Sequence, residues 1–118
     1  MAEHNLVVYK DILDWAEDYY ARVLLKQPRS GYAYHGRADA YRANNEHAKA
    51  IVDYTHAIEL MPKESRLYLG RGKSYSAIND TKKAIADFQK AVSMADKVHL
   101  KHQAEELLKI TQFNSLVE

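Results

Sequence analysis

Apolar and small residues in the middle of the chain recur at the three- and four-residue intervals of a helix face. Tyr34, Ala38 and Tyr41 have this spacing, and it resumes at Ala50 after a polar interval that contains two asparagines. Pro62 cannot continue a helical hydrogen-bond ladder, so it ends the second element. The pattern predicts amphipathic helices near 31–43, 46–60, 65–77 and 80–95.

The chain repeats itself with a period of 34 residues. When residues 31–64 are aligned with residues 65–98, residues of the same type recur along the whole unit. A unit of two helices that occurs twice predicts stacked helix hairpins. The identical pairs include Gly36/Gly70, Arg37/Arg71, Asn45/Asn79, Ile51/Ile85 and Asp53/Asp87.

Short polar residues mark the predicted helix ends. Their side chains can accept hydrogen bonds from the free amides at the start of a helix, and asparagine tolerates the backbone of a tight turn. The predicted turn and capping residues are Ser30, Asn44, Asn45, Ser65, Asn79 and Asp80.

The N-terminal flank, about residues 1–30, extends the pattern as a partial unit. In the register set by Pro28, residues 12–26 form the second helix of a unit whose first helix, within about 3–10, is truncated. No glycine or asparagine marks a turn between these two segments. One continuous helix over about 6–26 is therefore the alternative.

The C-terminal flank carries another apolar stripe at helical spacing. It predicts a helix over about 98–113 that covers the open end of the stack, because stacked repeats leave a terminal apolar face. The stripe consists of Leu100, Ala104, Leu107, Leu108 and Thr111.

Tyr68, Gly72 and Tyr75, followed by Ala84 and Phe88, resemble the pattern of the tetratricopeptide repeat (TPR) family. The resemblance covers both full repeats, the partial repeat and the capping helix. It implies an all-α fold in one domain, a right-handed superhelix of antiparallel helix pairs. The residues that carry this structural motif are Tyr34, Ala38, Tyr41, Ala50, Tyr54, Ala57, Pro62, Tyr68, Gly72, Tyr75, Ala84, Phe88 and Ala91.

The resemblance also implies a concave groove, lined mainly by the first helix of each pair, in which family members hold extended or helical peptides. The expected partner is therefore a protein or peptide. Arg42, Arg66 and Lys73 can hold its carboxylates, or they form solvated pairs with Asp39 and neighbouring acids. The positions expected to contact a ligand are Tyr9, Tyr32, His35, Asp39, Arg42, Arg66, Leu69 and Lys73.

Two glycines lie inside the first helices, where each costs about 1 kcal/mol of helix preference relative to alanine. Gly36 and Gly70 either lower the groove floor for a ligand backbone or reflect duplication or a tight helix contact. Chaperone-binding family members clamp a C-terminal carboxylate with Asn and Arg at these positions. A heat-shock chaperone tail is therefore not an expected ligand.

The charges nearly cancel, with 17 Lys and Arg against 16 Asp and Glu and a net charge of +1. This balance disfavours a sequence-independent nucleic-acid binder, which needs an excess of cations to displace phosphate counterions. The absence of cysteine excludes disulfides and Cys-ligated metals. We expect no membrane insertion, since no apolar stretch reaches about 18 residues, and we expect a soluble, cytoplasmic protein.

Catalytic and metal chemistry have weak signals. His99, His102 and Glu105 have helical spacing, but nothing supplies a fourth metal ligand. No phosphate-binding loop or nucleophile elbow occurs, and we expect no cofactor and no enzymatic activity.

The leading hypothesis is a non-catalytic adaptor or scaffold that binds a peptide or protein surface in its groove. The alternative is self-association as a homodimer, because the truncated N-terminal unit leaves an apolar end that can stack on a second copy. Trp15 is expected to cover that end.

Overall fold

The computed structural model describes residues 2–117, with side chains described for residues 9–117. The described residues form six α-helices and no strand. The helices are α1 (Ala2–Lys26), α2 (Gly31–Ala43), α3 (His47–Leu60), α4 (Ser65–Ala77), α5 (Thr81–Met94) and α6 (Val98–Val117). The predicted helices 31–43 and 65–77 coincide with α2 and α4. The predicted helix 46–60 begins one residue before α3, and the predicted helix 80–95 extends one residue beyond each end of α5.

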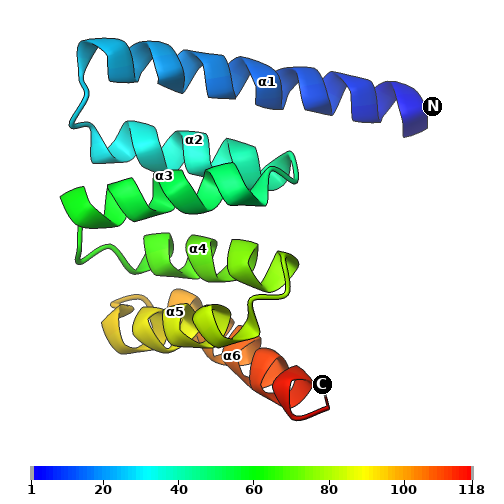
Figure 1. Ribbon diagram of the computed structural model, residues 1–118, viewed down its shortest axis with the longest axis vertical. Helices are drawn as coiled ribbons and strands as arrows, with labels where there is room; N and C mark the ends of the chain where they lie inside the picture. Colours follow the sequence, from blue (N-terminus) through cyan, green and yellow to red (C-terminus); the bar gives the residue numbers. More distant parts are fainter. Residues whose placement is uncertain (1, 118) are drawn as a thin grey trace.

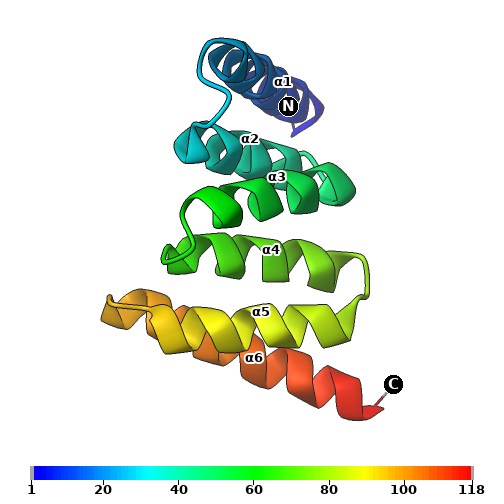
Figure 2. The same cartoon turned by 60° about the vertical axis from the view of Figure 1, so that its left-hand side comes forward.

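The helices stack in the order of the sequence, as a right-handed superhelix of antiparallel helix pairs (Figure 1). Hairpins α2–α3 and α4–α5 form the middle of the stack, with α1 packed on α2 and α6 packed on α5. In Figure 2, α1 is seen nearly end-on while α4 and α5 lie across the view, which reflects the turn between layers. Helices α2, α4 and α6 also contact one another in sequence, so they form one continuous side of the stack.

The N-terminal flank is a single helix, so the expected truncated first helix within 3–10 is wrong and the alternative of one continuous helix is confirmed. Lys10 Nζ lies 3.3 Å from Asp14 Oδ1, an i,i+4 pair that spans the position of the expected turn. Such pairs support a helix, and no glycine or proline interrupts it. The helix therefore runs through to Lys26 and overhangs α2, which is about half as long (Figure 1).

Two clusters of small and aromatic side chains form the core. Alanines at the helix crossings allow the helices of each hairpin to approach closely, and one aromatic ring from each second helix fills the space that remains. Ala104 brings α6 into the second cluster, so α6 extends the stack and continues four residues beyond its predicted end. The clusters contain Ala38, Ala50, Tyr54, Ala57 and Leu67, and Leu69, Ala84, Phe88, Ala91 and Ala104.

The helix ends follow the predicted polar residues in most places. Ser30 caps α2 by accepting a hydrogen bond from the Ala33 amide at 3.2 Å, and Asp80 accepts from the Lys83 amide at 3.4 Å. Asn45 and Asn79 have φ angles of 61° and 64°, so they supply the left-handed turn inside each hairpin. The prediction for Ser65 is wrong, because α4 begins at Ser65 and its N-cap is Glu64.

Candidate functional site

Three helices that lie along one side of the stack, α2, α4 and α6, form a hollow with a positively charged lining. Six of the eight positions predicted to contact a ligand lie in it, and they come from two different repeats. Leu100 of α6 and Gly70 of α4 complete the lining. We call this the cationic hollow; its residues are His35, Asp39, Arg42, Arg66, Leu69, Gly70, Lys73 and Leu100.

The carboxylate of Asp39 is engaged by neighbours within the hollow. The Tyr54 hydroxyl donates to Asp39 Oδ1, and His35 Nε2 lies 3.3 Å from Oδ2. Arg42 Nε donates to the Tyr54 hydroxyl at 2.9 Å, and its Nη2 lies 3.8 Å from Asp39. Although burial opposes ionisation, the hydrogen bonds from His35 and Tyr54 lower the pKa of Asp39 below its ordinary value. Asp39 is therefore ionised, and its carboxylate is already engaged by Tyr54, His35 and Arg42.

Lys73 and Arg66 are the free cations of the hollow. Burial lowers the pKa of Lys73, with the positive charge of Arg42 adding to the effect and Asp39 opposing it. Among the described side chains, neither Lys73 nor Arg66 forms an ion pair. The hollow thus holds two cations that form no ion pair with any acidic group among the described side chains.

A second hollow adjoins the first between α1 and α2. Tyr19 and Tyr20 contribute rings packed edge to face, with centroids 5.2 Å apart. His35 and Asp39 line both hollows, so the two are neighbours on one surface. We call this the tyrosine hollow; its residues are Tyr19, Tyr20, Val23, Ser30, Tyr32, Ala33, His35, Gly36 and Asp39.

The two remaining predicted contact positions, Tyr32 and Tyr9, lie in different places. Tyr32 lines the tyrosine hollow with 78% of its surface exposed. Tyr9 lines neither hollow and lies on α1 with 53% of its surface exposed. Its prediction assumed a separate first helix in the partial repeat, whereas the continuous α1 carries Tyr9 beyond the end of α2.

The sequence interpretation did not place six of the lining residues in the groove: Tyr19, Tyr20, Val23, Ser30, Ala33 and Leu100. Tyr20 and Val23 of α1 line the tyrosine hollow together with Tyr19, and none of the three was among the expected contact positions. Leu100 lies at the cationic hollow because α6 takes the place of a first helix. Tyr19 was the one sequence feature that pointed to this hollow, because it is an aromatic residue that the repeat motif does not account for.

Gly36 and Gly70 leave room for aromatic rings of the preceding helices. A Cβ atom on Gly70 would lie 2.6 Å from Cζ of Tyr54, and one on Gly36 would lie 2.2 Å from Cζ of Tyr20. Both distances are shorter than any normal carbon contact. The tight helix contact, one of the two alternatives that the sequence left open, explains these glycines.

Among the side chains described for residues 9–117, no group of three or more His, Asp or Glu is placed to hold a metal ion. None of the six helices combines the length and the apolar character that crossing a bilayer requires.

Comparisons with known proteins identify the repeat. Two sequence profiles, both described as tetratricopeptide repeat, match residues 31–64 and 65–97. A search of curated proteins found no match. Solved structures match over nearly the whole chain.

One similar structure is a T3SS complex from Aeromonas hydrophila, with 16% identity, a TM-score of 0.87, and coverage of 92% of this chain and 75% of that one. A second is the TPR2B domain of yeast Sti1 in its pHsp70 complex, with 20% identity, a TM-score of 0.82, and coverage of 89% and 86%. A third is the Yersinia enterocolitica type III secretion chaperone SycD with a peptide of the translocator YopD, at 14% identity, a TM-score of 0.79, and coverage of 97% and 87%.

At these identities the structural likeness shows the fold, and the profiles show the family. The two profile matches together span more than half of the chain and coincide with the two repeats seen in the helices. The chain therefore belongs to the tetratricopeptide repeat family.

Proposed function

We propose that the cationic hollow and the tyrosine hollow form one groove that binds a peptide segment of a partner protein, without catalysis. The observation that carries this proposal is the adjacency of the two hollows through His35 and Asp39. Together they offer aromatic surface and two unbalanced cations, Arg66 and Lys73, along one side of the stack. Aromatic rings contribute large buried area and polar handles to interfaces, and charges near them select the partner.

Relatives of the same fold support a peptide ligand. The Sti1 domain and SycD are both described in complexes, with pHsp70 and with a YopD peptide. These ligands belong to those proteins, and their contacts are not transferred to this chain. The shared fold supports a protein-interaction role, and the residues on this groove decide the partner.

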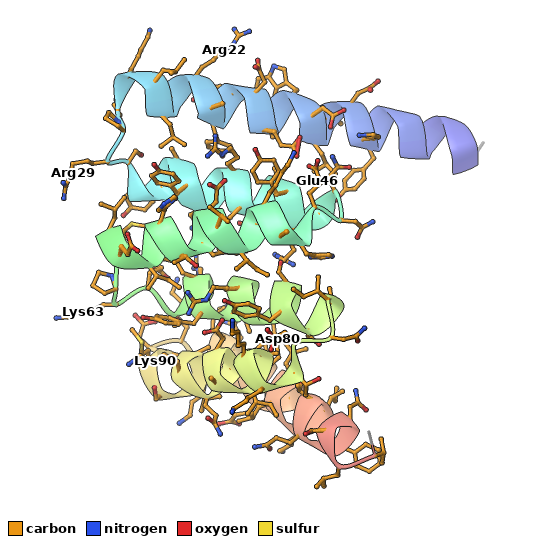
Figure 3. All side chains as sticks on the ribbon, viewed as in Figure 1. Arg22, Arg29, Glu46, Lys63, Asp80 and Lys90 are labelled. Atoms are coloured by element: carbon orange, nitrogen blue, oxygen red, sulfur yellow. The ribbon has the colours of Figure 1, made fainter. Side chains whose placement is uncertain are left out.

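Affinity capture with matched charge variants tests the proposal. Arg66→Glu with Lys73→Glu reverses the free cations of the groove, whereas Arg42 is kept because it binds Tyr54. Arg29→Glu with Lys90→Glu makes the same change of charge at exposed positions outside both hollows (Figure 3). We expect at least one protein to be captured by the wild type and the control and lost by the groove variant. Identical sets from all three forms would refute the groove.

Self-association is the second candidate, and one observation favours it. Within the described residues α1 packs only on α2, which leaves a row of apolar side chains uncovered on its outer face. On the same helix, the side chain of Arg22 points away from the stack (Figure 3). If two copies paired their α1 helices antiparallel, with the crossing point at the level of Ala16 and Glu17, Arg22 of one copy would lie beside Asp11 of the other. The exposed apolar side chains on this face are Ile12 and Trp15, and Tyr19 lies next to them at the edge of the tyrosine hollow.

Sedimentation equilibrium tests this second candidate. A dimer of the wild type that Trp15→Glu converts to a monomer supports it, because Trp15 is 67% exposed and a charge there costs the monomer little. A wild type that stays monomeric at all concentrations contradicts it. The control is Phe113→Glu, an exposed aromatic on α6 at the opposite end of the stack.

A further inference from the structure

The cationic hollow has more positive than negative side chains in its lining. Asp39 is the one acidic side chain in its lining, and it is already engaged by His35, Tyr54 and Arg42. Lys73, which is half-buried, and Arg66, which is exposed, have no carboxylate partner among the described side chains. A cation that has lost part of its hydration gains most from a direct ionic hydrogen bond. A carboxylate from outside the chain is the group that fits.

The position of this hollow within the groove decides which kind of carboxylate fits. On one side it continues into the tyrosine hollow, through His35 and Asp39. On its other side Leu100 of α6 borders it. A bound segment that crosses the stack therefore passes the cations in the middle of its path, with apolar surface before and after them. A peptide whose C-terminal carboxylate paired with the cations would end at this point, so it would leave the apolar surface on one side of them uncovered.

We propose that the groove selects an internal segment of a partner in which an Asp or Glu side chain lies between apolar residues. The carboxylate pairs with Lys73 and Arg66, one apolar residue enters the tyrosine hollow, and another lies against Leu100. This inference rests on the proposed peptide-binding function and adds the chemistry of the ligand. Selectivity follows because a segment without the acid leaves Lys73 half-buried and unpaired.

Random dodecapeptides displayed on phage are a suitable probe. Twelve extended residues span about 40 Å, which matches the longest dimension of the molecule, 40 Å. Selection on the wild type, with parallel panels on Arg66→Glu/Lys73→Glu and Arg29→Glu/Lys90→Glu, identifies groove binders as those lost only on the first panel. We expect these sequences to be enriched in an acidic residue flanked by apolar ones.

Synthetic versions of one selected peptide then separate the two sources of carboxylate. Each is acetylated at its N-terminus and labelled, and its Kd is measured by fluorescence anisotropy. We expect amidation of the C-terminus to change Kd less than twofold, and replacement of the internal Glu or Asp by Gln or Asn to weaken binding about tenfold. Lys73→Met should weaken binding to a similar extent, without adding to the effect of the peptide change, and Lys73→Arg should restore it.

The results that would overturn the inference are distinct from failure of the proposed function. Groove binders that carry no acid, or a peptide whose binding is abolished by C-terminal amidation, contradict an internal carboxylate while leaving peptide binding in place. If no selected peptide is sensitive to the groove variant, the proposed function itself fails. Thermal unfolding of Lys73→Met and Lys73→Arg shows whether both variants remain folded, and the peptide substitutions test the same contact with wild-type protein.

Discussion

Arg71 holds Asp87 through two parallel hydrogen bonds, from Nε at 2.8 Å and from Nη2 at 2.9 Å. Arg37 and Asp53 form the same pair one repeat earlier, at 2.6 and 2.9 Å. Each pair links the first helix of a hairpin to the second, and both carboxylates are buried. Arg37 and Arg71 stand at positions where the TPR pattern more commonly has Leu, so here an ion pair replaces an apolar contact.

We predict that Arg71→Leu lowers the free energy of unfolding by about 3 kcal/mol, because it leaves the buried charge of Asp87 without a partner. Arg71→Leu with Asp87→Leu should recover most of that loss, since apolar replacement of a whole buried pair is often neutral. Urea unfolding of the three forms measures this. Equal or greater loss in the double variant would show that the pair is not coupled as described.

Gly70→Ala tests the contact between Gly70 and the ring of Tyr54. The added methyl improves helix preference by about 1 kcal/mol, but it collides with a ring that is buried on all sides. Overpacking costs about 1–3 kcal/mol, so we predict a net loss of about 1 kcal/mol in unfolding experiments. Ser76→Ala, at an exposed position of the same helix, is the control and should not destabilise. A more stable Gly70→Ala variant would mean that the helices are less tightly packed than described.

Tyr54→Phe tests the polar network beneath the groove. Removing the hydroxyl takes one hydrogen bond from Asp39 and one from Arg42. We predict that the pKa of Asp39 rises and that stability falls by about 1–2 kcal/mol. The carboxyl carbon of Asp39, followed by NMR as the pH is varied, reports the first effect. An unchanged titration would contradict the network, whereas Tyr41→Phe, which removes a hydroxyl outside this network, should leave Asp39 unaffected.

The carboxyl group of Glu17 makes the packing of α1 against the rest of the stack dependent on pH. Its Oε1 atom is buried without a hydrogen-bond partner, beside Glu46 at the start of α3. Burial, then the hydrogen bond and charge of Glu46 and the charge of Asp14, raise the pKa of Glu17 to about 7, while Asn44 acts in the opposite direction. The hydrogen bond with Glu17 lowers the pKa of Glu46 and burial opposes this, while the charges of Lys49 and Lys10 lower it further.

The sign of the effect follows from linkage. A carboxyl group with a raised pKa in the folded state binds its proton more tightly there than in the unfolded chain. Glu17 therefore contributes stability below its ordinary pKa of 4.5, and this contribution is lost as the pH rises through about 7. We predict that Glu17→Gln flattens the fall in urea-unfolding stability between these pH values. Glu59→Gln, an exposed control on α3, should leave the wild-type slope unchanged.

The sequence predicted the hairpins well because both repeats carry the same periodic apolar face and the same turn residues. It left α1 undecided, since helical spacing fits both a continuous helix and a helix broken by an unmarked turn. The repeat register brought six candidate positions into one hollow, because first-helix positions face the same side in every repeat. Tyr9 lies outside both hollows, because its place was inferred from a separate first helix, whereas α1 is continuous.

The two Arg–Asp ion pairs show a second limit of prediction from the sequence. Arg37, Asp53, Arg71 and Asp87 were visible as identities between repeats, but their pairing depends on how two helices cross, which spacing along the chain does not encode. Leu100 could not be assigned to the groove either, because the place of α6 in the row of first helices follows from tertiary packing alone.

The most direct test of the account is chemical-shift mapping of a selected groove-binding peptide on the isotope-labelled chain. Peptide binding in the groove predicts that the largest amide shifts lie at Tyr20 and His35 of the tyrosine hollow and at Leu69 and Lys73 of the cationic hollow, with α3 and α5 little affected. Shifts concentrated on the outer faces of α3 and α5, with those four amides unmoved, would contradict it.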